Sequence, residues 1–199
     1  MSGKAVKVSK KIDARVARTR DVLGDAMIAL MLEKPFEEIT VQQVLDRAGV
    51  ARSTFYTHYR DKDDLFLSDA EEFFQAMATA VSRDDKDSIR IAPVRELFSH
   101  VADMREFSRA VVTSGKAHEL IQLGRGVFAR AVDERLASMP GARGLTPERR
   151  TAFAHASAGA MFSMLEWWVD RNERPSPAEM DALFHKFVWS GVSENSRSD

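Results

Sequence analysis

Apolar side chains recur at intervals of three and four residues along most of the chain. In the first such stretch, the apolar residues from Leu23 to Leu30 fall at positions i, i+3, i+4 and i+7, which places them on one face of an α-helix. Pro35 favours an end to this helix near Lys34, because the residue before a proline avoids the helical conformation. Residues 1–12 precede the pattern and are predicted to form a flexible arm.

Two short helices are predicted next, separated by a tight turn. Thr40 and Gln43 form the capping-box pattern T-x-x-Q, so a helix is expected to begin at Val41. Gly49 can adopt the left-handed conformation that ends a helix in a sharp reversal, and helix-compatible sequence resumes at Arg52. A helix of about two turns, a glycine turn and a second helix form the helix-turn-helix pattern.

The rest of the chain predicts further helices and no strand. Asp61 is expected to cap a helix that runs to about Val81, and the polar stretch 82–88 is expected to form a loop and a domain boundary. The predicted fold is all-α with about nine helices. Its expected parts are a basic arm at 1–12, a helix-turn-helix region with a connecting helix at 13–81, a second helical region at 93–191 and a disordered tail at 192–199.

Composition excludes several classes of protein. A hydrophobic content of 44% and a charged content of 30% are ordinary for a soluble globular chain of 199 residues. No apolar run approaches the roughly 20 residues that span a membrane, and no apolar stretch follows the basic N-terminus as in a secretory signal. The absence of cysteine excludes disulfides, thiolate catalysis and cysteine-ligated zinc. These features fit a cytoplasmic protein that contacts no membrane.

Charge is distributed unevenly along the chain. Residues 1–62 hold 12 Lys or Arg and 8 Asp or Glu, a balance of +4, whereas residues 63–199 hold 17 and 22, a balance of −5. In the first twenty residues, seven cations accompany a single acid, Asp13. A basic end on an acidic body indicates contact with a polyanion, although a solvated tail explains the charge equally well.

The segment TVQQVLDRAGVARSTFYTHYRDKDDL, residues 40–65, resembles the DNA-binding domain of the tetracycline-repressor (TetR) family. The resemblance includes the cap, the A-G-V turn, the T-x-Y-x-H-aromatic run and the lysine after the next cap. It implies a dimeric regulator, commonly a repressor, that is released from a palindromic operator in double-stranded DNA by a small, largely apolar effector. Activation, and regulation without a ligand, are alternatives within the same fold.

The second predicted helix of this segment has one apolar face and one polar face. Phe55 and Tyr59 are four residues apart and are expected to anchor the helix to the core. By resemblance, the residues that read bases are Arg52 and Ser53, with Thr54 a weaker candidate. The candidates for phosphate contacts are Thr40, Tyr56, His58 and Lys62.

Several of these residues also have a purely structural interpretation. Thr40 can act as a cap alone, Tyr56 can simply pack, and His58 can be a satisfied structural histidine. Ala51 stands where the family often has a capping serine, and alanine cannot cap, which costs the helix about 1 kcal/mol. Ser53 also replaces a common glycine, so the operator sequence cannot be transferred from the family.

The region 93–191 holds no comparable motif. The resemblance implies that it binds the effector and forms a homodimer through the last two helices, and the small residues of AHASAGAMFSM at 154–164 allow helices to approach closely. Flexible and aromatic side chains suit an apolar ligand, although each of them also suits an ordinary core. The candidate ligand-binding residues are Met104, Phe107, Phe128, Met161 and Trp167.

Two other classes of protein fit the sequence less well. The five histidines are scattered and form no metalloprotease, esterase or phosphate-loop pattern, so no catalytic residue, metal site or cofactor is predicted. A helical metal-dependent enzyme would have to use His100, His118 and a carboxylate. A protein-interaction module would leave both the basic arm and the polar helix face without a role.

Overall fold

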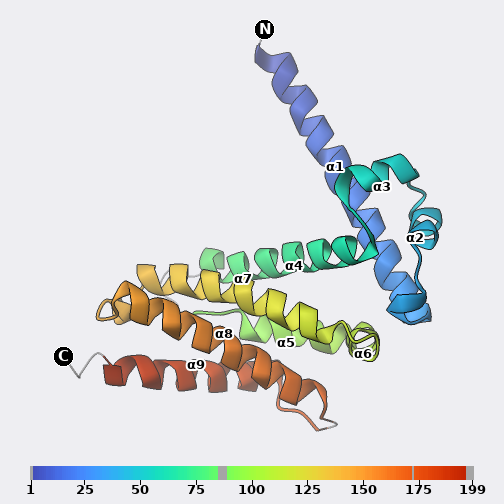
Figure 1. The fold of residues 1–199 in the computed structure, drawn as a ribbon. Helices are drawn as coiled ribbons and strands as arrows, with labels where there is room; N and C mark the ends of the chain where they lie inside the picture. Colours follow the sequence, from blue (N-terminus) through green and yellow to red (C-terminus); the bar gives the residue numbers. More distant parts are fainter. Residues whose placement is uncertain (1, 85–88, 172, 196–199) are drawn as a thin grey trace. The chain divides into compact units, whose positions relative to one another are not determined.

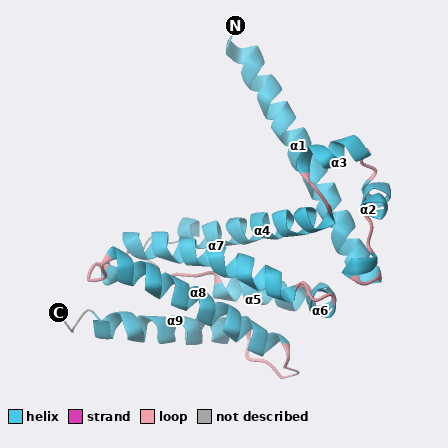
Figure 2. Cartoon of the chain, in the orientation of Figure 1, coloured by secondary structure: helices cyan, strands magenta, loops and turns pink. Residues whose placement is uncertain are grey.

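The computed structural model describes residues 2–84, 89–171 and 173–195. Within these residues every regular element is a helix, which confirms the predicted all-α fold (Figures 1 and 2). No helix in the described ranges is long and apolar enough to cross a membrane. The elements are α1 Ser2–Glu33, the 3-10 turn η1 Phe36–Glu38, α2 Val41–Ala48, α3 Arg52–His58, α4 Lys62–Asp84, α5 Val94–Asp103, α6 Arg105–Thr113, α7 Ala117–Ser138, the 3-10 turn η2 Pro140–Ala142, α8 Pro147–Val169 and α9 Pro177–Asn195.

Local signals account for several helix ends. The side chain of Thr40 accepts a hydrogen bond from the Gln43 amide and the Gln43 side chain accepts one from the Thr40 amide, which confirms the capping box of α2. Gly49 ends α2 with a φ of 64°, the left-handed conformation that favours glycine. Ser176 and Glu179 form the corresponding box at the start of α9.

The beginning of the chain differs from its prediction. Residues 2–12, expected to be a flexible arm, belong to α1, which continues back to Ser2. No proline interrupts this stretch, and most of its residues are compatible with a helix, so the polar sequence extends the helix rather than ending it. At the other end α9 continues to Asn195, into the predicted tail 192–199, and residues 196–199 lie outside the described ranges.

The chain divides into two compact units. The first contains residues 1–70 and 106–117, and the second contains residues 71–105 and 118–199. The division falls inside α4, whereas the polar composition of residues 82–88 predicts a boundary there. Composition alone does not reveal that one continuous helix carries the chain from the first unit into the second.

The first unit has its own apolar core. Phe36 and Phe66 pack with their ring centroids 5.4 Å apart, and Phe55 lies against Tyr59 at 5.6 Å. Burial of such side chains supplies most of the free energy that holds short helices such as α2 and α3 in place. The residues of this core with at most 3% exposure include Leu23, Met27, Phe36, Ile39, Val44, Leu45, Phe55, Tyr59 and Leu65.

The second unit is built around a cluster of aromatic rings. Phe128 of α7 and Phe162 of α8 have centroids 5.8 Å apart, and Phe74 of α4 contacts both rings. Gly124 allows α7 to approach α8, because a Cβ atom there would collide with the ring of Phe162. The cluster therefore depends on both large rings and a missing side chain.

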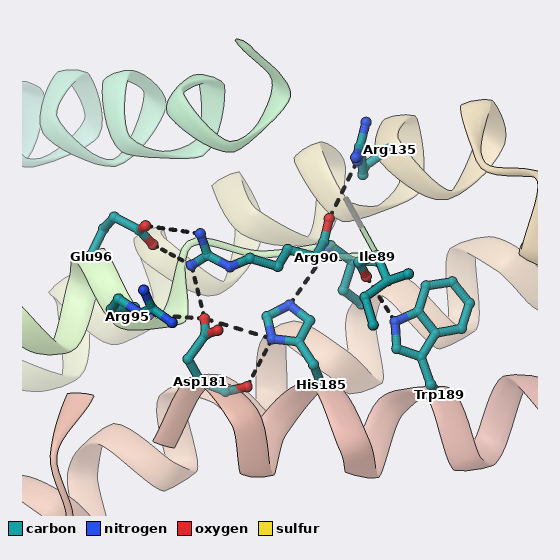
Figure 3. A network of polar contacts seen from close by, with 9 residues as sticks. Ile89, Arg90, Arg95, Glu96, Arg135, Asp181, His185 and Trp189 are labelled. Atoms are coloured by element: carbon teal, nitrogen blue, oxygen red, sulfur yellow. Dashed lines mark hydrogen bonds and ion pairs between the residues drawn. The ribbon is translucent and has the colours of Figure 1, made fainter. Parts of the chain in front are cut away.

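A buried polar network ties the segment before α5 to α9 within the second unit (Figure 3). Asp181 accepts hydrogen bonds from Arg90 Nη2 at 2.8 Å and from the Arg95 amide at 3.1 Å. His185 accepts from the Ile91 amide at 3.1 Å through Nε2, and its Nδ1 lies 2.8 Å from the Asp181 carbonyl. Burial lowers the pKa of His185. A neutral ring with its proton on Nδ1 satisfies both contacts.

Candidate nucleic-acid interface

The core of the first unit holds α3 by one face and leaves the other face exposed. Phe55 is fully buried and packs edge-on against Tyr56, and Tyr59 is 3% exposed, so the predicted anchors of α3 are confirmed. Arg52, Ser53 and Tyr56 lie on the solvent side. Ala51 precedes the helix without a side-chain cap, as its sequence requires.

Arg52 lies between α2 and its own helix. Its Nη1 donates to Gln42 Oε1 at 3.3 Å, and its guanidinium lies 5.7 Å from the centroid of the Tyr56 ring. The Gln42 side chain also donates to Asp46 at 2.8 Å. These contacts restrain the arginine at the junction of the two helices without burying it, and such restraint lowers the entropy lost on binding.

The exposed polar face contains more than the predicted residues. Gln42 and Thr57 are both exposed, and Gln42 shares the face through its bond to Arg52. The Thr57 hydroxyl donates to the Ser53 carbonyl at 2.9 Å. No sequence pattern indicated Gln42, because it lies in the first helix of the motif, where the pattern consists of apolar positions.

Three predicted residues are less accessible. Thr54 and His58 are half-buried, and His58 contacts Tyr59 edge-on at a centroid distance of 6.3 Å. Thr40 is exposed but already uses its hydroxyl as the acceptor of the capping box. The DNA contacts assigned to these side chains remain predictions.

Lys62 has a structural partner that the sequence did not indicate. Its Nζ donates to the carbonyl oxygens of Phe36 at 2.7 Å and Glu37 at 3.2 Å, and it lies 4.6 Å from the centroid of the Phe36 ring. The ammonium therefore holds η1 against the start of α4. Any phosphate contact of Lys62 has to be made by an ammonium group that already donates hydrogen bonds to these two carbonyl oxygens.

The candidate ligand-binding residues differ in burial. Phe128 and Met161 are fully buried in the core of the second unit. Trp167 is instead 46% exposed, with the Arg171 guanidinium 4.1 Å from its ring centroid. Met104 ends α5 in the second unit, whereas Phe107 lies on α6 in the first, and both are half-buried.

The two histidines named for the enzyme alternative lie in different surroundings. The ring of His100 lies against Phe73 with centroids 4.4 Å apart, and burial lowers its pKa. His118 is exposed near the start of α7. Among the residues that the structure describes, no three histidines or carboxylates lie where they could share a metal ion.

Comparison with known proteins agrees with this geometry. Residues 24–68 match the family of "Bacterial regulatory proteins, tetR family". The chain is 24% identical over 176 residues to an uncharacterized HTH-type transcriptional regulator, YxbF, of Bacillus subtilis, covering 85% of this chain and 43% of that protein. It is 35% identical over 72 residues to the HTH-type transcriptional repressor Rv1474c of Mycobacterium tuberculosis, covering 36% and 38%. The chain thus spans less than half the length of either curated relative.

The fold is shared with solved regulators. A putative TetR-family transcriptional regulator from Syntrophomonas wolfei superimposes with a TM-score of 0.63 at 16% identity, covering 88% of this chain and 95% of that one. Such low identity shows the fold, and the matched helix-turn-helix adds the sequence signature. Residues 24–68 therefore form a DNA-binding region of the TetR family, and the whole chain has the fold of solved TetR-family transcriptional regulators.

Proposed function

We propose that this protein is a transcriptional repressor that recognises a palindromic DNA operator through α3. The observation that carries the proposal is the two-sided character of α3, in which a fully buried Phe55 fixes the helix while Arg52, Ser53 and Tyr56 face solvent. A short, firmly anchored helix with an exposed polar face fits the major groove. A regulator of bacterial genes acts where the chromosome lies, so we place it in the cytoplasm.

The chemistry of the exposed side chains suggests their roles. Arg52 can donate two hydrogen bonds to guanine O6 and N7, and Ser53 and Thr54 can bond to several base edges. Tyr56 and His58, together with Thr40, are assigned to phosphates, which fix the position of the helix without selecting a sequence. Lys62 contributes charge at the start of α4 while it holds η1.

Selection of bound sequences from a random pool of DNA duplexes tests the proposal. The expected product is a near-palindrome whose half-sites are about one helical turn apart, because a two-fold symmetric dimer places two α3 helices in successive major grooves. Recovery of no enriched sequence at low salt would contradict sequence-specific recognition.

Arg52→Ala is expected to relax base preference at one position of each half-site. The loss of a bidentate contact should cost about 1–3 kcal/mol with the selected duplex and much less with a duplex altered at that position. Fluorescence anisotropy titrations with both duplexes measure the difference. Arg60→Ala is the matched control, because Arg60 is an exposed arginine just beyond α3 that pairs with Asp64 at 3.0 Å. If Arg52→Ala and Arg60→Ala change base preference equally, the assignment of Arg52 is wrong.

The basic end of α1 supplies a second, non-specific contact. Lys4, Lys7, Lys11, Arg15 and Arg18 recur at intervals of three and four residues, so the helical register of α1 puts these positions on one face. Arg15 and Arg18 are exposed. We propose that this face binds phosphates beside the bases that α3 reads.

Replacement of the three lysines on this face by glutamine should make binding less sensitive to salt. The slope of log affinity against log salt should become shallower by about 0.9 for every phosphate that the protein no longer neutralises. Anisotropy titrations over a range of salt concentrations measure the slope, and base preference should not change. Arg130→Gln, Arg143→Gln and Arg149→Gln together remove three exposed cations of the second unit as a control. Equal slopes for the two triple variants would refute the role of the α1 face.

The second unit is proposed to form the dimer. TetR-family regulators function as dimers, and here three large apolar side chains on α8 and α9 are exposed in the single chain. Trp167 is 46%, Leu183 57% and Phe187 65% exposed. Exposed apolar side chains on adjacent helices indicate a surface that another protein covers. We assign that partner to a second copy of the chain, through the last two helices.

Control by a small molecule completes the proposal. TetR-family regulators bind small-molecule effectors, and the helical region of residues 93–191 is the region proposed to receive one. A ligand that binds better to a form unable to contact DNA releases the operator by shifting the population of the two forms. Phe128 and Met161 remain candidates for such a site, whereas the exposure of Trp167 favours a role in the dimer surface.

A further inference from the structure

Three polar side chains from three parts of the first unit meet at the end of α3. Tyr59 follows the last residue of α3, and its amide donates to the Phe55 carbonyl at 2.9 Å. Its hydroxyl accepts a hydrogen bond from Arg20 Nε of α1 at 3.1 Å and donates a long one to Asp69 Oδ1 of α4 at 3.5 Å. The Arg20 guanidinium also lies 5.9 Å from the centroid of the Tyr59 ring. We call Arg20, Tyr59 and Asp69 the Tyr59 junction.

Burial makes the geometry of the Tyr59 junction consequential. Tyr59 is 3% exposed and its ring packs on Phe55, so the hydroxyl has little freedom to find other partners. A buried hydroxyl deprived of its partners would be costly, which favours the one arrangement that satisfies it. The end of α3 is consequently held by directional bonds as well as by packing.

Gly24 shows how closely α1 and α4 approach at this point. It lies one turn after Arg20, and a Cβ atom at Gly24 would collide with the carboxylate of Asp69. The absence of a side chain on α1 thus makes room for the carboxylate of Asp69. This contact is independent of the Tyr59 hydroxyl and places Asp69 at the same crossing of α1 and α4.

We infer that the Tyr59 junction sets the orientation of α3 on α1 and α4. Tyr59 is a positioning residue in this account, because it acts on DNA only through the helix that it ends. The consequence for DNA rests on the proposed function, whereas the restraint on α3 is a property of the free protein. The two parts can be tested separately.

Hydrogen–deuterium exchange of the full chain without DNA tests the restraint. Tyr59→Phe keeps the ring and removes the hydroxyl, and Asp69→Asn removes the charge of its acceptor. Each should speed exchange of the amides of residues 52–59 by about 10- to 100-fold, in line with the loss of a hydrogen bond to a charged group, and leave the peptides of the second unit unchanged. Tyr56→Phe removes the hydroxyl of an exposed tyrosine and should have no such effect.

A double variant distinguishes the Tyr59 junction from two unrelated stabilising contacts. If Tyr59 and Asp69 act together, the α3 amides of the double variant Tyr59→Phe/Asp69→Asn should exchange at most about 3-fold faster than those of the single variant with the larger effect. The inference would be overturned if the acceleration in the double variant equalled the product of the accelerations in the two single variants. It would also be overturned if the α3 amides of both single variants exchanged at the wild-type rate. If Tyr59→Phe unfolds the whole first unit, Asp69→Asn alone decides between these outcomes, since it leaves the buried ring in place.

Titration with the selected operator tests the consequence for DNA. Tyr59→Phe should weaken binding about 10-fold for all sequences alike, without changing base preference. Faster exchange of α3 with unaltered operator affinity would overturn the positioning role. If the wild-type protein binds no DNA but α3 exchanges faster in Tyr59→Phe, the proposed function is refuted and the restraint on α3 is supported.

Discussion

Phe55→Ala should unfold the DNA-binding unit or bring it close to unfolding. The Phe55 side chain is 0% accessible to solvent and contacts the rings of Tyr56 and Tyr59. Removal of a buried phenylalanine side chain costs about 3–5 kcal/mol, a large part of the stability of a typical domain. The destabilisation falls on α3, which has only seven residues and no side-chain cap.

Aromatic residues allow the two units to be followed separately. Both tyrosines lie in the first unit, at 56 and 59, and all three tryptophans lie in the second, at 167, 168 and 189. In Phe55→Ala we expect the first unit to unfold at a lower urea concentration than the second unit. Hydrogen exchange of the first unit's amides measures the first transition, and tryptophan fluorescence measures the second. Tyr56→Ala removes the neighbouring, exposed ring and should change stability by about 0.5 kcal/mol or less. Equal stability of the two variants would contradict the assigned orientation of α3.

Asp181→Ala should destabilise the second unit by about 3–5 kcal/mol, because it leaves a partly buried arginine without one of its charged partners. The carboxylate of Asp181 is 7% exposed and binds both Arg90 and the Arg95 amide. Arg90 holds its own place in the network through its carbonyl, which accepts from Arg135 Nε at 3.3 Å (Figure 3). Removal of the Asp181 carboxylate thus loosens the connection of the segment before α5 to α9.

Glu96→Ala is the matched control for Asp181→Ala. Glu96 binds the same arginine with both carboxylate oxygens, but its side chain is 40% exposed, so its removal should cost about 1 kcal/mol or less. Urea unfolding followed by tryptophan fluorescence measures both variants, and Trp189 lies within the network, where its indole donates to the Ile89 carbonyl at 2.8 Å. An Asp181→Ala variant no less stable than Glu96→Ala would show that burial does not strengthen this ion pair.

Local signals allowed much of the fold to be predicted. Capping residues and glycine act over one turn of helix, so the start of α2 and the turn at Gly49 could be read directly from neighbouring residues. The burial of Phe55 and Tyr59 followed from their spacing of four. These are the features that also hold the exposed face of α3 in place.

The features that could not be predicted depend on partners far apart in the chain. Lys62 bonds to a carbonyl 26 positions earlier, and Arg90 pairs with a carboxylate 91 positions later. No periodicity or cap encodes such a pair, because it exists only once the helices have packed. Trp167 shows a similar limit of sequence information. An apolar residue on a helix can line a pocket or lie on the outer surface, and the sequence alone does not distinguish the two positions.

The ratio of affinities for selected and scrambled DNA measures sequence-specific recognition by α3. Anisotropy titrations of the wild-type protein at one fixed salt concentration would compare the selected palindromic duplex with a duplex of the same composition in scrambled order. If α3 reads bases through Arg52 and Ser53, the palindrome should bind at least about 10³-fold more tightly. Equal affinity for the two duplexes would contradict sequence-specific recognition by this helix.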